Sequence, residues 1–348
     1  MKHFCLIRLV CGWLLLLCLL VSGAVNEIHA QQPAPPASPE TAQGIQHYRQ
    51  GNYSEAVAAL KTATKKNKND AEAWHFMGLA LHSQGKLKDA RKAFELAISL
   101  CPDYAPSRAA LAYMLLLTNK TGAAKDEAER ALRSDPQNAE ASYIMAELQL
   151  REKAYDDAIQ RTGEITRLHP EFAAAWLLHS QAIIGQFVKA RQNKGQADNG
   201  RITGMAEAVN SLNRFLQLSQ GKNSAALKLW REQLEGLKLY AELADKTNPD
   251  PGVFNMSEVR TKPVLVYKEP VRYTDAARSH GTQGTVVIMM IIDETGIVRS
   301  PFAIQSLPDG LTESALRAAS KMRWKPAEKD GKPVAVIMWS VEFTFNIY

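Results

Sequence analysis

A fixed period of 34 residues runs through much of this sequence. Pro102, Pro136 and Pro170 follow it, and so do two further series of small or apolar residues. These series are Ala56, Ala90, Ala124 and Ala158, and Ala63, Ala97, Ala131 and Ile165. Because one period appears at several phases, we infer that a single structural unit is repeated and that each unit buries its apolar face against its neighbours. The period therefore predicts a solenoid, which we place at residues 40–247.

The residue types within one period indicate two antiparallel helices. The clearest unit, residues 71–104, carries large, small and helix-ending residues in a fixed order: Trp74, Met77, Gly78, Leu81, Gly85, Ala90, Phe94, Ala97 and Pro102. Alanine lets two helix backbones approach, large side chains fill the space between units, and proline ends the second helix. The order and spacing resemble the tetratricopeptide repeat. That resemblance implies an all-α superhelix whose concave face binds a peptide or a partner helix.

The resemblance also implies which side chains face the groove of the solenoid. They lie on the first helix of each unit: His75, His82, Tyr113, Tyr143, Glu147, Arg151 and Gln181. These residues share no charge, and no clamp of Lys, Asn and Arg for a terminal carboxylate is evident among them. Two interpretations therefore remain: the groove binds a second partner, or the solenoid is a spacer or a surface for self-association.

The fifth unit is interrupted, and the solenoid then ends. A polar stretch rich in Gly and Asn predicts an inserted surface loop at about residues 190–205. Residues 224–245 follow with apolar residues at helical spacing and predict a terminal helix. The sequence Asn-Pro-Asp-Pro-Gly at residues 248–252 then predicts a linker, which we place at 248–259.

Residues 260–348 show strand periodicity. The apolar run at 285–293 and the turn residues at 293–296 predict a hairpin, and apolar residues from Leu311 to Met322 recur at helical spacing. From Ile337 to Ile347 apolar and polar residues alternate, which predicts a final strand with one buried and one solvated face. The expected fold class is therefore multidomain, with an all-α solenoid followed by a small α+β domain, an antiparallel sheet backed by one helix.

The order of motifs in this segment resembles the TonB C-terminal domain. The motifs are residues 269–278 (EPVRYTDAAR), 284–286 (GTV), 293–296 (DETG), 324–327 (WKPA) and 331–334 (GKPV). One departure is Thr274, where the family usually has proline. The resemblance implies protein binding without catalysis, in which a partner's extended segment pairs with an exposed sheet edge. The candidate edge residues are Val336, Met338, Ser340, Glu342, Thr344 and Asn346. The alternative is that this is simply the last strand of a stable sheet.

The N-terminus resembles an export signal. Lys2 and Arg8 precede an uncharged stretch from Leu9 to Asn26, and small residues at Ala24 and Ala30 offer cleavage sites. We expect residues 1–30 to be a signal peptide, followed by a proline-rich linker at 31–39. The protein would then be periplasmic. The alternative is an uncleaved anchor in the inner membrane facing the periplasm.

Catalytic and nucleic-acid-binding functions find little support. The formal net charge is +6, with 42 basic and 36 acidic residues interspersed, which is a weak basis for nucleic-acid binding. No nucleophile, phosphate-loop or metal motif is present, so we expect no enzyme, no catalytic or metal site and no cofactor.

The expected function is a TonB-like adaptor in cell-envelope transport. Its partners would be envelope proteins or peptides, with an outer-membrane transporter as one candidate, and it would contact membranes only through an uncleaved N-terminus. The alternative is an assembly scaffold without energy transduction.

Overall fold

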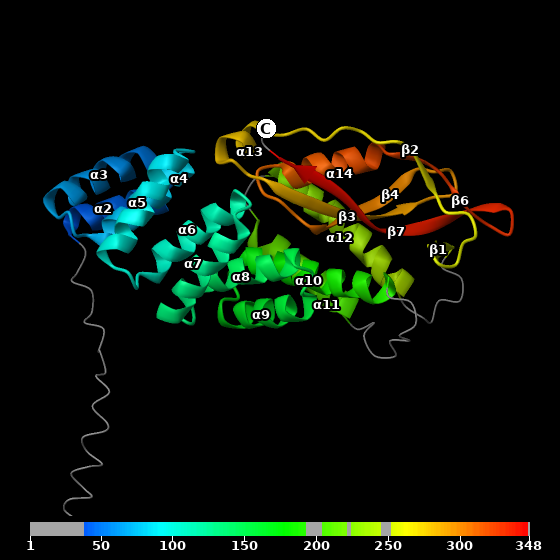
Figure 1. Cartoon of the computed structure of the whole chain (residues 1–348), viewed down its shortest axis with the longest axis horizontal. Helices are drawn as coiled ribbons and strands as arrows, with labels where there is room; N and C mark the ends of the chain where they lie inside the picture. The colour runs from blue at the N-terminus through cyan, green and yellow to red at the C-terminus, as the bar shows by residue number, and fades with distance from the viewer. Residues whose placement is uncertain (1–37, 193–203, 221–223, 245–251, 347–348) are drawn as a thin grey trace, which may run out of the picture.

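The computed structural model describes residues 38–192, 204–220, 224–244 and 252–346. The expected signal peptide at 1–30, most of the linker at 31–39 and most of the inserted loop at 190–205 lie outside these residues. A run of helices comes first, and a segment of strands with two further helices follows (Figure 1). The expected fold class is confirmed: a solenoid of paired helices precedes a small sheet-containing domain.

The solenoid consists of antiparallel helix pairs that follow the 34-residue period. Its helices are α2 (Pro39–Arg49), α3 (Tyr53–Lys66), α4 (Ala71–Ser83), α5 (Leu87–Leu100), α6 (Ala105–Leu117), α7 (Thr121–Ser134), α8 (Ala139–Arg151), α9 (Tyr155–Leu168), α10 (Ala173–Gln192), α11 (Gly204–Leu218) and α12 (Ser224–Ala244). The turns inside four pairs place Gly51, Gly85, Asn119 and Lys153 at positive φ. The left-handed turn therefore recurs with the repeat even where glycine is replaced.

The C-terminal domain contains a mixed sheet and a smaller ribbon. Its elements are β1 (Val253–Asn255), β2 (Val264–Tyr267), α13 (Asp275–His280), β3 (Gly284–Ile292), β4 (Val298–Gln305), α14 (Leu311–Lys321), β5 (Arg323–Lys325), β6 (Ala327–Lys329) and β7 (Lys332–Phe345). The sheet order is β1-β7-β3-β4, with β6 also paired to β7, while β2 and β5 form a separate two-stranded ribbon. Thr274, the departure from the family pattern, caps α13 by accepting a hydrogen bond from the Ala277 N–H at 3.1 Å.

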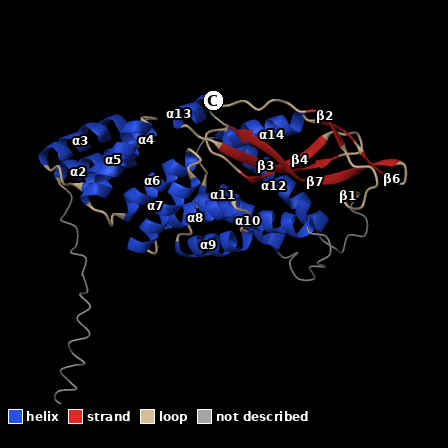
Figure 2. Cartoon of the chain, viewed as in Figure 1, coloured by secondary structure: helices blue, strands red, loops and turns tan. Residues whose placement is uncertain are grey.

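The sheet is covered on both faces. On one face of β3, Val286, Ile288 and Met290 pack with α14. On the other face, Val287, Met289 and Ile291 join a cluster with residues of α10, α11 and α12. Figure 2 shows the strands between α14 and α12. The sequence predicted one covering helix; the second layer comes from the solenoid itself, because β3 is apolar on both faces and both must be buried.

The final strand does not keep one buried face throughout. Ile337 packs toward the solenoid, whereas Phe343 and Phe345 pack toward α14, although all three have odd numbers. The pairing of β7 with β3 moves from Val341–Ile288 to Met338–Met290, so β7 contains one extra residue there. Because of this bulge, odd-numbered side chains of β7 point to one face of the sheet before it and to the other face after it. The prediction of a single uninterrupted alternation from Ile337 to Ile347 was therefore wrong.

The segment expected to be a linker at 248–259 contributes a strand to the sheet. Val253, Phe254 and Asn255 form β1, which pairs in parallel with Ala335, Val336 and Ile337. The turn residues of the segment gave no indication of this pairing, since three residues are too short a run for a periodicity to appear. As a result, the N-terminal part of β7 is paired on both sides.

Candidate functional site

The C-terminal part of β7 leaves one backbone edge open. Beyond Ile337, where β1 ends, the described part of the chain pairs β7 with β3 on one side only. The Glu342 carbonyl accepts a hydrogen bond from Lys268 Nζ at 3.4 Å, so this carbonyl points away from β3. Backbone groups two residues apart in a regular strand point the same way, so Thr344 also faces the open side. We refer to Met338–Phe345 as the open edge.

Most of the sequence-predicted edge residues lie at this open edge. Ser340, Glu342 and Thr344 are exposed, Met338 is half-buried, and Asn346 is exposed directly after the strand. Val336 does not belong to the open edge, because it is fully buried and pairs with Phe254 of β1. The site is therefore shorter than expected and begins after Ile337.

The opposite edge of the sheet is closed by the solenoid. Gln233 of α12 donates through Nε2 to the Pro301 carbonyl at 2.6 Å and accepts from the Ala303 N–H at 2.8 Å. The hydroxyl of Tyr240 donates to the Ser300 carbonyl at 2.8 Å. These side chains occupy the outward backbone groups of β4, so a strand from another molecule would have to displace them.

The solenoid keeps a groove of about 510 Å³ on its first helices. Four of the seven predicted groove residues line it, namely His75, His82, Tyr113 and Tyr143. Phe172, which precedes α10, also lines the groove and lies 5.5 Å from the Tyr143 ring, centroid to centroid. The periodicity of the first helices did not indicate Phe172, because it belongs to the turn between two units.

The groove presents mainly uncharged rings at neutral pH. Burial lowers the pKa of His75 to about 4, so its imidazole is neutral. Burial also raises the pKa of Tyr113 to about 12 and raises that of Tyr143 well above its usual value, so both phenols stay protonated. An aromatic, neutral surface of this kind fits apolar side chains of a peptide or helix.

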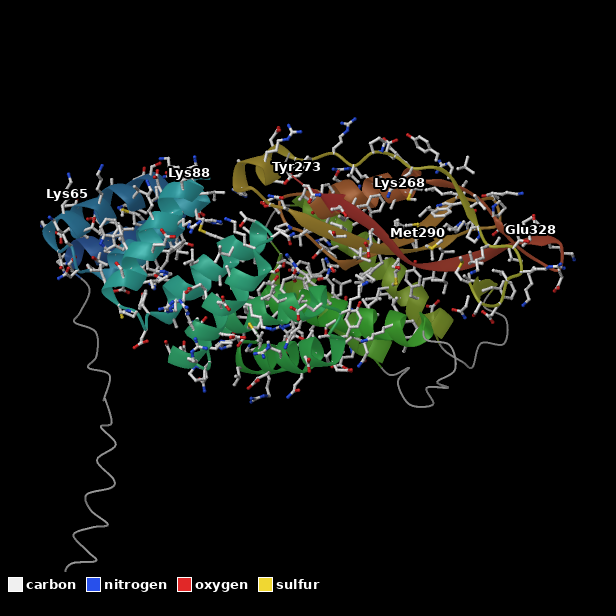
Figure 3. All side chains as sticks on the ribbon, viewed as in Figure 1. Lys65, Lys88, Lys268, Tyr273, Met290 and Glu328 are labelled. Carbon is white, nitrogen blue, oxygen red and sulfur yellow. The ribbon has the colours of Figure 1, made fainter. Side chains whose placement is uncertain are left out.

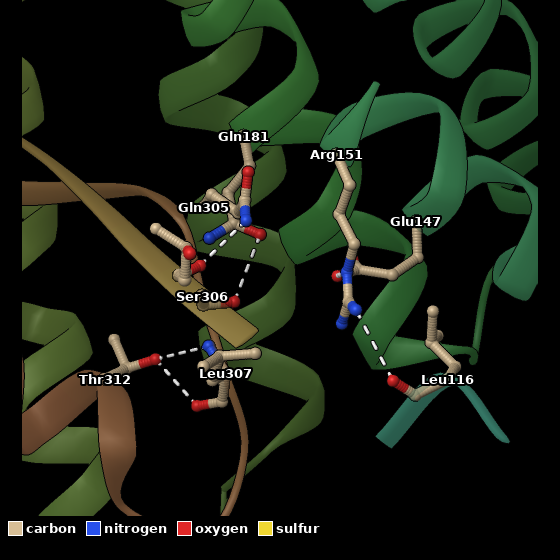
Figure 4. A network of polar contacts seen from close by, with 9 residues as sticks. Leu116, Glu147, Arg151, Gln181, Gln305, Ser306, Leu307 and Thr312 are labelled. Atoms are coloured by element: carbon tan, nitrogen blue, oxygen red, sulfur yellow. Dashed lines mark hydrogen bonds and ion pairs between the residues drawn. The ribbon is translucent and has the colours of Figure 1, made fainter. Parts of the chain in front are cut away.

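The other three predicted groove residues have partners inside the protein, as Figure 4 shows. Arg151 Nε donates to Glu147 Oε1 at 3.0 Å, and its guanidinium also reaches the Leu116 carbonyl at 3.4 Å. Gln181 Nε2 donates to the Ala303 carbonyl at 3.2 Å, and its Oε1 accepts from Ser306 Oγ at 3.4 Å. These residues do not line the groove, and Gln181 instead joins the solenoid to the C-terminal domain.

Among the described residues, no group of three or more His, Cys, Asp or Glu side chains is placed to hold a metal ion. Within the same residues, no helix is long and apolar enough to cross a membrane.

A solenoid with an open groove and a sheet with an open edge define a class of protein-binding molecules. Family comparison agrees. Residues 41–105 and 115–182 match two tetratricopeptide repeat models, and residues 269–347 match the model described as Gram-negative bacterial TonB protein C-terminal. The chain therefore joins a tetratricopeptide repeat array to a TonB C-terminal domain. Both are protein-binding modules, and the second comes from proteins of the Gram-negative envelope.

The solved structures that resemble this chain cover only part of it. "Crystal structure of MamA protein" is 20% identical, with a TM-score of 0.37, and covers 53% of this chain and 91% of its own. "Functional Characterization of Pseudomonas Aeruginosa pilF" is 15% identical, with a TM-score of 0.44, and covers 61% of this chain and 87% of its own. No curated protein sequence matches the chain.

Proposed function

We propose that this protein is a non-enzymatic adaptor of the Gram-negative cell envelope that binds two partners at once. The open edge from Met338 to Phe345 pairs with an extended segment of one partner, and the aromatic groove holds a peptide or helix of another. The observation that carries this proposal is the contrast between the two sheet edges: side chains of α12 close β4, whereas no described strand pairs with the outward side of β7 beyond Ile337.

The proposed partner of the open edge is an outer-membrane transporter. The match to the TonB C-terminal model at residues 269–347 supports this choice, because it includes the open edge. Main-chain hydrogen bonds would supply most of the affinity, since the exposed side chains of Ser340, Glu342 and Thr344 form neither an apolar nor a uniformly charged surface. The protein would act in the periplasm, reached by means of the N-terminal export signal.

A second candidate function is an assembly scaffold without energy transduction. One observation favours it: the C-terminal domain is packed against its own solenoid. The cluster that joins α10, α11 and α12 to β3, β4 and β7 buries Trp230, Leu237 and Phe302. A domain held in this way presents its open edge at a fixed position relative to the groove, which suits the bridging of two partners.

Site-specific photo-crosslinking in growing cells tests the proposed function. A photoreactive residue at Thr344 should form a covalent adduct with an outer-membrane transporter, and one at Tyr113 should form an adduct with a different protein. A matched probe at the exposed Glu95 on α5 should yield neither. The adaptor proposal fails if the probe at Thr344 gives no adduct or the same adducts as the probe at Glu95. A transporter adduct that persists without proton-motive force favours the scaffold.

A further inference from the structure

An exposed apolar surface lies on the ribbon of β2 and β5, away from the groove and the open edge. All four residues of β2 are exposed: Val264 by 58%, Leu265 by 41%, Val266 by 70% and Tyr267 by 47%. Ile297, which bridges to Arg323 on the other side of β5, is 43% exposed. A run of consecutive exposed apolar residues on an edge strand is unusual in a protein that remains monodisperse, so this surface is a candidate binding site.

Basic side chains share a face with this apolar run. Val264 pairs with Lys325 and Tyr267 pairs with Arg323, and cross-strand partners point to the same face of a ribbon. Lys262 precedes β2 in the sequence and is also exposed. Within the described residues, no carboxylate forms an ion pair with Lys262, Arg323 or Lys325. We call the apolar residues and these three cations the ribbon patch; Lys268 is not part of it, because it contacts the open edge.

The ribbon patch lies on the side of the C-terminal domain that faces away from the solenoid. Figure 1 shows β2 above α14, with α8 to α11 on the opposite side, and Figure 3 shows side chains projecting outward along that upper side of the domain. The patch is thus accessible while the solenoid packs on the other face of the sheet.

The charge of the patch selects its partner. A second copy of this chain, pairing β2 with β2, would place the two β5 strands about 14 Å apart, at three strand spacings, and would leave Arg323 and Lys325 without a counter-charge. An anionic partner would instead neutralise them. The charge of the patch therefore favours an anionic partner over self-pairing.

The shape of the patch selects among anionic partners. Leu265 pairs with Trp324, so it lies on the face of the ribbon opposite to Val264. The side chains of Val264 and Leu265 are nevertheless both exposed. A partner strand would cover the edge of β2 and leave apolar surface on both faces of the ribbon. A lipid interface can surround both faces, with Tyr267 at the headgroup level and the basic side chains reaching the phosphates.

We propose that the ribbon patch binds the surface of an anionic phospholipid membrane. The valines and Leu265 enter the headgroup region, and Lys262, Arg323 and Lys325 contact lipid phosphates. The sequence led us to expect membrane contact only through the N-terminus, because exposure of β2 cannot be predicted from its apolar composition. This contact would hold the domain at a membrane while leaving the open edge and the groove free.

A fluorophore placed in the patch tests this proposal independently of the N-terminal segment. The full chain with all four cysteines replaced by serine and with Val266→Cys carries the environment-sensitive dye NBD at residue 266. Vesicles of phosphatidylcholine and phosphatidylglycerol in a 7:3 ratio should increase and blue-shift its emission, and vesicles of phosphatidylcholine alone should not. The same dye on Leu96→Cys, an exposed leucine of the solenoid, should report water with both vesicles.

The charges are tested in the same assay. Arg323→Glu with Lys325→Glu should weaken the vesicle response at residue 266 by about an order of magnitude or more, and 0.5 M salt should have a similar effect. Circular dichroism must show that the variant is folded. Unchanged emission at residue 266 with anionic vesicles would overturn the proposal. A response without vesicles that grows with protein concentration would also overturn it, in favour of self-association, as would a response to an acidic polypeptide but not to vesicles.

Discussion

The side-chain amide of Gln233 pairs with the backbone of Ala303 as a neighbouring strand would. Its Oε1 accepts from the Ala303 N–H at 2.8 Å, and its Nε2 donates to the Pro301 carbonyl at 2.6 Å. Proline at position 301 already removes one outward donor from this edge. The sheet therefore has one edge closed by the solenoid and one edge open to a partner.

Replacing Gln233 should destabilise the protein. Gln233→Leu leaves the Ala303 N–H and the Pro301 carbonyl buried without partners, which costs about 1–3 kcal/mol. Urea unfolding measures this loss. The control is Gln137→Leu at an exposed turn position of the solenoid, which should change the free energy of unfolding little. Equal effects of the two substitutions would mean that Gln233 does not close the edge.

The C-terminal domain should not fold well when separated from the solenoid. A fragment of residues 252–348 exposes Val287, Met289, Ile291 and Phe302, which the solenoid covers in the full chain. We expect this fragment to bind the dye ANS and to lack a cooperative thermal transition, whereas the full chain should unfold as one unit. A sharp transition of the isolated fragment would contradict the observed coverage of both sheet faces.

Replacing two glycines of the solenoid by alanine should change the free energy of unfolding in opposite directions. A Cβ at Gly78 would lie 2.5 Å from a ring carbon of Phe94, so Gly78→Ala overpacks the contact between α4 and α5 and should cost about 1–3 kcal/mol. A Cβ at Gly122 in α7 would meet nothing within 4 Å, so Gly122→Ala should stabilise by about 0.5–1 kcal/mol. Urea unfolding of both variants checks the signs, and a neutral Gly78→Ala would refute the close approach.

Stability should fall in acid partly because of His75. Burial lowers the pKa of His75 in the folded state to about 4, from the ordinary value of 6.5. The unfolded chain therefore takes up this proton first as the pH falls, and up to about 3 kcal/mol of stability is lost between pH 6.5 and pH 4.

The variant His75→Gln isolates this contribution. Glutamine does not titrate and can still reach Ser107 Oγ, which lies 3.1 Å from His75 Nδ1. Urea unfolding at pH 7 and pH 4.5 should show a smaller loss in His75→Gln than in the wild type. The same substitution at His169, which follows α9, serves as the control. An identical loss in His75→Gln and the wild type would show that His75 does not carry this dependence.

The 34-residue period predicted the solenoid well because each repeat makes its contacts with its neighbours in sequence. Ala90, Ala124 and Ala158 are fully buried where the helices of a pair cross, as the spacing indicated. The groove was predicted in part: His75, His82, Tyr113 and Tyr143 line it, but Gln181 turns to Ala303, which is 122 residues away in sequence. No local pattern indicates so distant a contact.

The sheet was harder to predict from the sequence. Alternation placed Ser340, Glu342 and Thr344 at exposed positions, and Glu342 and Thr344 follow the bulge and keep a regular period. Alternation wrongly placed Val336 at the open edge, because β1 covers that position and its three residues in a turn-rich stretch cannot be predicted as a strand. The sequence also did not predict that β2 is exposed, because four consecutive apolar residues are more often buried.

Partner binding to folded Glu342→Pro tests the central claim that the open edge binds by main-chain pairing. The N–H of Glu342 faces away from β3, so its removal leaves the ladder intact and circular dichroism should be unchanged. Binding to the transporter crosslinked at Thr344, measured by calorimetry, should be abolished in Glu342→Pro and retained in the side-chain control Thr344→Ala. A folded Glu342→Pro variant that binds this partner as tightly as the wild type would contradict the claim.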